Sequence, residues 1–395
     1  MPCCCSFSKK AYLKRKPQVL VITNYRPDQQ KSMLRFGDLL ISNSPNHRNF
    51  NIEEIYPNSV FSKICPIEKL RKWAAYVDKY LLFPKRLKRI FISRKNQVQL
   101  VHIVDHSNSI YLPKISRVTE AKKIITCHDL IAIRTANGDF AQAPKTSKSG
   151  LHLQNWISKS LRLADYYACD SRQTQQDLNR LIPLSKEKSS ILHLGTKADL
   201  STTNSYEKIL LKIHPFDPYT TNFLLHVGSA AWYKNRKAVF RSFIHAYSSL
   251  PDHHLKLVLV GPGPQKEEMD KQFSNWVKTH PNAIFSLQNL PDNVLAELYK
   301  HAKALVFPSF IEGFGWPPLE AAIRGCPVIT TSTGAIADLL GKYAKYVESE
   351  NQESIDQKVL QVLKSARSSK SAITLPSNED CRGGYFDLYQ KMMGN

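Results

Sequence analysis

The sequence predicts an α/β protein made of two domains, each built on a parallel sheet. Short apolar segments alternate with segments of helical periodicity in both halves of the chain, which is the pattern of parallel strands joined by helices. The chain has 395 residues, which exceeds the usual size of one hydrophobic core. Two cores, one in each half, therefore fit the sequence better than one.

A polar stretch without apolar runs separates the two halves. X-Pro steps within it mark turns rather than strands or helices. We therefore expect an N-terminal domain, a linker, a C-terminal domain and a final helix, at 1–200, 201–222, 223–376 and 377–395.

In the N-terminal half, apolar strands end beside polar side chains. The strand that begins at Lys122 delivers His128 and Asp129 to its carboxyl edge, and an earlier strand, near 99–105, ends beside His106. Ligands of open α/β sheets bind at this edge, so these side chains are candidates for a cleft. An imidazole can both donate a hydrogen bond to a polar ligand and accept one from it, although a surface histidine at a strand end is the ordinary alternative.

The segment 63–95 is the most basic part of the chain. It holds eleven Lys and Arg residues against two Asp and Glu, and its apolar residues predict a pair of amphipathic helices broken at Pro84. Such helices bind anionic membrane surfaces, with each nearby cation contributing on the order of 1 kcal/mol. The alternative is a solvated basic helix pair that packs on the sheet. The sequence leaves both open.

The C-terminal half alternates strands and helices without interruption, as expected for a parallel sheet. Strands are predicted at 223–228, 255–261, 283–287, 304–308, 327–331 and 344–348, and helices at 235–250, 265–279, 292–302 and 317–325, with a last helix in the aromatic tail.

The first loop of this half joins a strand to a helix that starts with two cations. Gly228 ends the strand, and Lys234 and Arg236 stand at the beginning of the helix. Cations are unfavourable at a helix N-terminus unless an anion lies there, so their placement predicts a bound diphosphate. Two solvated cations on a basic protein are the alternative.

The stretch FPSFIEGFGWPPLEAAIRG, Phe307–Gly325, is the most informative part of the chain. Its apolar start predicts a buried strand, and Glu312 follows at the carboxyl edge, where ligands bind. Gly313 and Gly315 can take a positive φ and allow a close approach to their backbone. A Pro-Pro pair suits the start of a helix that can hold a phosphate, with Glu320 in its first turn, where ribose hydroxyls are natural partners. Each glutamate alone is an ordinary surface acid, but together with the glycines and prolines they predict a sugar-nucleotide pocket.

This stretch resembles a known family. Glu312–Ala321 matches EGFGxPxLEA, in which seven residues separate two glutamates, as in the retaining, metal-independent glycosyltransferases of the GT-B fold, family 4 of the group 1 type. The following Gly325–Thr330 and Thr333–Leu340 are similar to the family's next strand and loop. The resemblance covers nearly all of 17–393 and is strongest over 223–340. It implies two Rossmann-like domains that face a central cleft, with an acceptor domain first, a nucleotide-sugar domain second, and a final helix that crosses back to the first.

The resemblance also implies roles for individual residues. In the family, the first glutamate contacts the transferred sugar and the second contacts the nucleotide ribose, which gives these roles to Glu312 and Glu320. A histidine at the place of His128 touches the donor sugar in many members. The remaining donor-binding candidates are Gly228, Lys234, Arg236, Gly313, Phe314 and Gly315.

Two loops depart from the family's pattern. Ser229 stands where relatives carry an arginine before the lysine, and Tyr25-Arg26-Pro27-Asp28 stands where many relatives carry a Gly-Gly pair near the diphosphate. Arg26 is therefore a further cleft candidate, beside Asp129 and His106.

The resemblance implies a same-face substitution through an oxocarbenium-like state, in which a phosphate oxygen takes the acceptor proton. A covalent double displacement through Glu312 stays open. The chain contains no Asp-x-Asp pair for a divalent ion, so we expect no metal and no cofactor. Lys234, Arg236 and helix N-termini would neutralise the leaving diphosphate.

Charge is concentrated in the N-terminal half. Residues 1–200 hold 34 Lys and Arg against 15 Asp and Glu, a net charge of +19, and the remaining 21 against 18 give +3. The basic face therefore belongs to the acceptor side. The resemblance implies a nucleotide sugar and a glycan or lipid-linked acceptor as partners, and an anionic membrane surface is the further partner if segment 63–95 binds a membrane. Nucleic acid is not expected, because no recognisable RNA- or DNA-binding module accompanies the charge.

No segment reaches the roughly 18 apolar residues that span a bilayer, and the start MPCCCSFSKK lacks the apolar core of a signal peptide. We expect a cytoplasmic protein that can lie on the inner face of a membrane. The eight cysteines have no metal spacing, so neither a disulfide framework nor a zinc site is predicted.

The function expected from these features is the transfer of a hexose from a nucleotide sugar to a glycan or lipid-linked acceptor. Two alternatives remain: a GT-B-like nucleotide-sugar-binding protein without turnover, and a basic nucleic-acid-binding protein.

Overall fold

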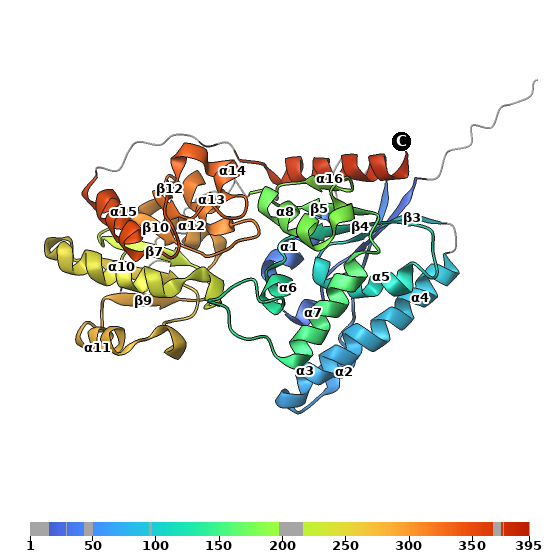
Figure 1. The fold of residues 1–395 in the computed structure, drawn as a ribbon, viewed down its shortest axis with the longest axis horizontal. Helices are drawn as coiled ribbons and strands as arrows, with labels where there is room; N and C mark the ends of the chain where they lie inside the picture. Colours follow the sequence, from blue (N-terminus) through green and yellow to red (C-terminus); the bar gives the residue numbers. More distant parts are fainter. Residues whose placement is uncertain are drawn as a thin grey trace, which may run out of the picture.

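The computed structural model describes residues 16–28, 30–42, 50–94, 97–196, 216–365, 373 and 375–394. Two parallel six-stranded sheets lie side by side, each flanked by helices (Figure 1). The predicted fold class, an α/β protein with two parallel sheets, is confirmed. Most of the predicted linker lies outside the described residues.

The N-terminal sheet has the strand order β2-β1-β3-β4-β5-β6. Its strands are buried on both faces at the centre, as is usual for a parallel sheet covered by helices. The strands are β1 (Gln18–Ile22), β2 (Asn51–Ile55), β3 (Val98–Ile103), β4 (Lys122–Cys127), β5 (Tyr166–Cys169) and β6 (Ser189–Ile191). The helices are α1 (Lys31–Ile41), α2 (Phe61–Ile64), α3 (Glu68–Val77), α4 (Phe83–Ser93), α5 (Leu112–Ile115), α6 (Ile131–Ala136), α7 (Lys148–Leu161) and α8 (Arg172–Leu181).

The basic helices α3 and α4 are continuous, so the predicted break at Pro84 is wrong. The residues from Asp78 to Leu82 form a π-helical turn in which the Phe83 N–H donates to the Asp78 carbonyl. Pro84, the second residue of α4, follows this wider turn directly, and its missing N–H leaves one backbone hydrogen bond unmade without ending the helix. The buried face of α4 packs into the core of the N-terminal domain, whereas α3 fully buries no side chain.

The C-terminal sheet has the strand order β12-β11-β10-β7-β8-β9. Its strands are β7 (Phe223–Val227), β8 (Lys256–Val260), β9 (Ile284–Leu287), β10 (Ala304–Phe307), β11 (Val328–Thr330) and β12 (Lys345–Tyr346). The helices are α10 (Arg236–Ser249), α11 (Lys271–Thr279), α12 (Asp292–His301), α13 (Trp316–Ile323), α14 (Ile336–Leu340) and α15 (Gln352–Lys364). The last two helices were not among the predicted elements.

Two helices of this domain begin elsewhere than predicted. α11 starts at Lys271 because the Asp270 carboxylate caps it, accepting a hydrogen bond from the Phe273 N–H at 2.8 Å. α13 starts at Trp316, and Gly315, with φ of 91°, is its N-cap. Glu320 is therefore the fifth residue of α13, and the predicted place in the first turn is wrong.

The last helix, α16 (Asn378–Met393), lies along the N-terminal domain (Figure 1). Its Arg382 Nε donates to the Leu39 carbonyl of α1 at 2.9 Å. The Tyr389 hydroxyl lies 2.6 Å from Nδ1 of His102 in β3, inside the core. The C-terminal end of the chain is thus fixed to the first sheet. No helix in the described part of the chain is both long and apolar enough to span a bilayer.

Candidate active site

Lys234 and Glu312 form a buried ion pair at the carboxyl edge of the C-terminal sheet. Lys234 Nζ donates to both carboxylate oxygens of Glu312, at 2.9 and 3.0 Å. The two side chains are only 12% and 7% exposed. Removing two charges from water is costly, so a buried ion pair of this kind contributes little net stability to the fold. Its presence at the edge of the sheet points instead to a functional site.

The loops that carry this pair are tied together by Asn235, which has a left-handed backbone with φ of 50° just before α10. Its side-chain amide donates to the carbonyls of Pro308 and Ser349, at 3.1 and 2.7 Å. The Phe310 N–H donates to the Tyr233 carbonyl at 2.8 Å. These bonds fix Lys234 opposite the loop of Glu312.

The glycine next to Glu312 brings the two domains into contact. A Cβ on Gly313 would lie 2.1 Å from the His128 carbonyl oxygen, so only glycine fits there. Gly313 does not have a positive φ, contrary to the expectation, because close contact rather than backbone conformation requires it. Gly315 does have one, and a Cβ there would meet Ile336 Cγ1 at 2.5 Å.

His128 lies at the end of β4 and is bonded on both ring nitrogens. Nδ1 is 2.6 Å from the Asp170 carboxylate, and Nε2 is 2.8 Å from the Val104 carbonyl oxygen. Because both partners accept, both nitrogens carry a proton and the ring is an imidazolium. Burial alone would lower the pKa of His128, but the charge of Asp170 and then of Asp105 raise that pKa to about 9.

Asp170 has a larger role than the sequence suggested. Asp170 was not among the site residues predicted from the sequence. The Ser171 hydroxyl does cap α8, accepting from the Thr174 N–H at 3.1 Å, while the fully buried Asp170 is the partner of His128.

A second buried carboxylate lies beside His128. Asp105 accepts from the Asn24 amide at 2.7 Å, and its oxygen is 3.4 Å from Nδ1 of His106. Burial would raise the pKa of Asp105, but the nearby charges of His106 and His128 lower it. The cleft candidates His106 and His128 therefore belong to one cluster at the carboxyl edge of the first sheet. Asp129 closes its own loop by accepting from the Ile131 N–H at 3.0 Å.

The structure does not bring Arg236 to Glu312. The buried guanidinium donates from Nη2 to the Gly263 carbonyl at 3.0 Å, and its Nε lies 3.2 Å from Glu268. Nη1 has no hydrogen-bond partner among the described residues. Gly261 lies against the backbone of Gly228 in the same region. A Cβ on Gly261 would lie 2.1 Å from the Gly228 carbonyl oxygen, so only glycine fits there.

Arg26 is also directed elsewhere. It bonds Glu54 of the edge strand β2, at 3.1 Å, and remains about half exposed. Phe314 is buried, with its ring 5.1 Å from that of Trp316 and 6.3 Å from that of His193. Phe314 thus fills the space between the two domains.

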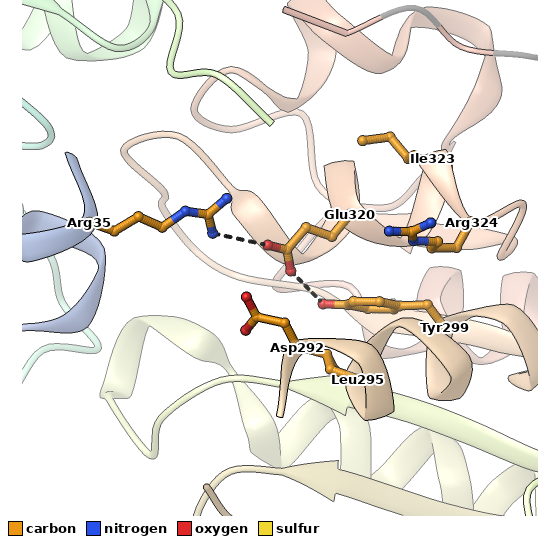
Figure 2. A pocket seen from close by; sticks show the side chains of 7 residues that line it. All are labelled: Arg35, Asp292, Leu295, Tyr299, Glu320, Ile323 and Arg324. Atoms are coloured by element: carbon orange, nitrogen blue, oxygen red, sulfur yellow. Dashed lines mark hydrogen bonds and ion pairs between the residues drawn. The ribbon is translucent and has the colours of Figure 1, made fainter. Parts of the chain in front are cut away.

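Glu320 lies in a separate, small pocket of about 20 Å³ formed with α12 and α1 (Figure 2). The Tyr299 hydroxyl donates to its Oε2 at 3.1 Å. Arg35 Nη1, from the N-terminal domain, lies 3.9 Å from its Oε1, and the Arg35 guanidinium stacks 4.7 Å from the centre of the Trp316 ring. Burial raises the pKa of Glu320, although Arg35 and Tyr299 act in the opposite direction.

Sequence reasoning missed several residues of this arrangement: Asn24, Arg35, Asp105, Asn235, Gly261 and Tyr299. Asn235, between Lys234 and Arg236, and Asp105, just before His106, stood in stretches that we had singled out, but their residue types alone gave no reason to choose them. Within the described part of the chain, no three or more His, Cys, Asp or Glu side chains come together as a metal site would require.

Part of the chain is similar to known glycosyltransferases. Residues 214–374 match the family described as glycosyl transferases group 1. The serotype-specific mannosyltransferase WbdA of Escherichia coli is 26% identical over 260 residues, which is 62% of this chain and 30% of that protein. The O-antigen chain mannosyltransferase B of Escherichia coli is 24% identical over 297 residues, 74% of this chain and 72% of that protein. The chain thus spans about a third of the length of WbdA.

The fold is shared with solved enzymes of low sequence identity. Sucrose-phosphate synthase from Thermosynechococcus elongatus superposes with a TM-score of 0.62 at 16% identity, covering 96% of each chain. This likeness shows the fold alone. The chain has the two-domain, Rossmann-like GT-B fold, and the family match in its second domain supports a GT-B glycosyltransferase of the group 1 type.

Proposed function

We propose that this chain is a retaining, metal-independent hexosyltransferase of family 4 that uses a nucleotide sugar as donor. The observation that carries the proposal is the buried pair of Lys234 and Glu312, which lies against the His128 loop where the two domains meet. A paired lysine and glutamate at this place provide one cation for a diphosphate and one carboxylate for a sugar. No other group of the described residues combines these two properties at the carboxyl edges of both sheets.

In this proposal, the donor exchanges the partners of the ion pair. The diphosphate replaces Glu312 as the partner of Lys234, and Glu312 then accepts from hydroxyls of the hexose. The N-terminus of α10 adds its dipole, and the free Nη1 of Arg236 offers one more donor to an anion. Gly228, Gly313 and Gly315 keep the surrounding loops compact.

Glu320 holds the ribose in the same scheme. Its carboxylate stands in an open pocket with only one short hydrogen bond, from Tyr299, and with Arg35 at 3.9 Å. Two ribose hydroxyls are suitable donors for the remaining oxygen positions. Their arrival would replace Arg35, because a direct hydrogen bond is stronger than a contact at that distance.

His128 stands in this scheme as a positioning residue at the edge of the cleft. The Asp170 carboxylate balances its charge, and the bonds on both ring nitrogens fix the loop that Gly313 contacts. Asp129 and His106 are proposed to shape the same edge, and Arg26 to act at its border.

The proposed reaction balances within the donor and acceptor. The bond between the anomeric carbon and the diphosphate oxygen breaks, and a bond from the acceptor oxygen forms on the same face of the sugar. The acceptor proton passes to a phosphate oxygen, so no side chain is consumed. A double displacement, with Glu312 as a covalent nucleophile, gives the same stereochemistry and is separated from this route by trapping of a glycosyl-enzyme.

Mannose is the first sugar to test, because several relatives are named as mannosyltransferases. Two of these names refer to the O-antigen chain, so a polysaccharide or a lipid-linked glycan is the proposed acceptor class. The proposed place of action is the cytoplasm, at the inner face of a membrane. The comparisons support neither of the two alternatives, a binding protein without turnover and a nucleic-acid-binding protein.

Thermal unfolding of the purified chain tests the donor site. UDP, GDP, ADP and their common hexose conjugates are added with and without EDTA. A ligand present at about 100 times its dissociation constant stabilises by roughly 2.7 kcal/mol, which shifts the unfolding temperature measurably. One nucleotide should stabilise the wild type equally with and without EDTA, and should stabilise Glu320→Ala clearly less. A shift that requires a divalent ion would contradict the metal-free site, and no shift with any nucleotide would contradict the donor site itself.

A further inference from the structure

The N-terminal domain has a second, larger pocket that the donor site does not use. It has a volume of about 660 Å³ and lies between the loop after β1 and the helices α2 and α3. Tyr25, Asp28 and Tyr76 contribute to its walls, and its cations are Lys63, Arg71, Lys72 and Lys79.

The pocket is strongly cationic because its acids are already committed. Asp28 pairs with Lys79 at 2.8 Å. The buried Asp78 accepts from the N–H groups of Phe61 and Ser62, at 2.9 and 3.1 Å, and so holds the start of α2. No carboxylate of the described residues lies within ion-pair distance of Lys63, Arg71 or Lys72, which makes these three cations available to an anion.

An exposed apolar surface borders these cations. On α2, α3 and the turn between them, Ile64 is 71% exposed and Trp73 is 64% exposed. Phe61, Ile67 and Leu70 are exposed on the same segment. Exposed apolar side chains that cluster in this way usually mark a binding surface. Their mixture with cations fits a molecule that has both an anionic group and a hydrocarbon chain.

The pocket is joined to the active-site cluster through two consecutive residues. Tyr25 contributes to the wall of the pocket, and its hydroxyl donates to Asp78 at 3.0 Å. Asn24, the residue before it, bonds Asp105 beside His128. The pocket therefore borders the carboxyl edge of the first sheet, the edge at which His128 contacts Gly313 of the second domain.

We propose that this pocket binds the phosphate group of an anionic amphiphile, which is the acceptor. Lys63, Arg71 and Lys72 hold the phosphate, and the apolar side chains of α2 and α3 hold the hydrocarbon chain. The acceptor part of this inference rests on the proposed function, whereas the binding part does not.

Intrinsic fluorescence tests the binding, because Trp73 lies on the proposed contact surface. Decyl phosphate is titrated below its micelle concentration, with decyl maltoside as a neutral amphiphile and inorganic phosphate as the head group alone. Trp73→Phe identifies which part of the signal comes from α3. Decyl phosphate should bind at least ten times more tightly than either of the other probes.

Matched double variants locate the site. Arg71→Ala with Lys72→Ala should weaken decyl phosphate binding at least tenfold. Lys88→Ala with Arg89→Ala removes the same charge from exposed positions of α4, outside the pocket, and should leave binding unchanged. Ile64→Ser should weaken decyl phosphate without affecting inorganic phosphate, while Ile92→Ser on α4 serves as its control.

The outcomes separate this inference from the donor site. If both double variants lose decyl phosphate affinity equally, binding depends on the overall charge of the protein and not on this pocket. If decyl maltoside binds as tightly as decyl phosphate, binding depends on apolar contact alone. Either result would overturn the proposed site. Binding of inorganic phosphate as tight as that of decyl phosphate would overturn the amphiphile. A nucleotide shift without decyl phosphate binding overturns this inference alone. Decyl phosphate binding without any nucleotide shift overturns the proposed function and with it the acceptor role, but leaves the binding pocket in place.

Discussion

Arg35 in α1 and Glu320 in α13 face one another across the two domains, with Arg35 Nη1 3.9 Å from Glu320 Oε1 (Figure 2). The pair is partly exposed, and ion pairs of this kind contribute about 0–1 kcal/mol. The contact therefore holds the domains only weakly, and a ligand that offers hydroxyl groups to Glu320 can replace it.

Replacing Arg35 should strengthen nucleotide binding. In Arg35→Met the side chain keeps its packing on Trp316 but no longer competes for Glu320. Because the contact is worth at most about 1 kcal/mol, we expect up to roughly fivefold tighter binding of the nucleotide by calorimetry. Weaker binding in this variant would instead show that Arg35 contacts the nucleotide directly.

Replacing Glu320 should weaken nucleotide binding. Hydrogen bonds to a charged group contribute about 1.5–3 kcal/mol, so Glu320→Ala should bind roughly 10 to 150 times more weakly. Tyr299→Phe removes the hydroxyl that orients the carboxylate and should have a smaller effect of the same sign. If both variants bind the nucleotide as tightly as the wild type does, Glu320 does not contact the ribose.

In a double-mutant cycle of Lys234 and Glu312, we expect the double variant to regain stability but not activity. Glu312→Gln leaves the buried Lys234 without its counter-charge, and breaking a buried pair costs about 3–5 kcal/mol when nothing relaxes. Lys234→Met with Glu312→Gln removes both charges and should be less destabilised than the sum of the single variants, as measured by urea unfolding. The double variant should still lack sugar transfer, and activity in it would contradict the proposed roles.

His128 should make stability depend on alkaline pH. Its folded pKa of about 9 lies above the ordinary value of 6.5, so the contribution is fully present below pH 6.5 and is lost as pH rises through about 9. The unfolding free energy of the wild type should fall between pH 7 and 9.5, and His128→Asn should show a shallower decline. The other titrating groups are the same in both proteins, so their effects cancel in this comparison. If the unfolding free energies of the two proteins fall equally with pH, His128 is not an imidazolium.

Gly313→Ala should disturb the contact between the domains while leaving each domain folded. The added methyl group would lie 2.1 Å from the His128 carbonyl oxygen, so one of the two loops must move. We expect a loss of sugar transfer of at least tenfold, because displacements of about 1 Å at a reacting site have effects of that size or larger. Gly383→Ala, in α16 with nothing within 4 Å of its Cβ and no positive φ, is the control for a glycine substitution away from the site.

Local signals explain which parts of the fold were predictable. The strand before Gly228, the helix after it and the loop of Glu312 each carry glycines, prolines or an apolar run within a few residues. The pairing of His128 with Asp170 spans 42 positions, and the approach of Arg35 to Glu320 joins two domains. Contacts of this kind depend on sheet order and domain placement, which a local pattern does not contain.

At Pro84, in contrast, a local rule predicted a helix break that the structure does not have. A proline inside a helix removes one hydrogen bond, and this predicts a break. In α4 the proline stands at the second position, and the preceding π-helical turn already bonds Phe83 back to Asp78. The helical backbone therefore continues, and a single-residue rule could not anticipate that turn.

The measurement that tests the central claim most directly is proton NMR of the sugar released when the donor is turned over in EDTA. Slow transfer to water needs no identified acceptor, and the first anomer formed reports the stereochemistry before mutarotation. The account predicts release with the donor's own anomeric configuration by the wild type, and none above background by Glu312→Gln. Release of the opposite anomer, release only after a divalent ion is added, or equal release by Glu312→Gln would contradict it.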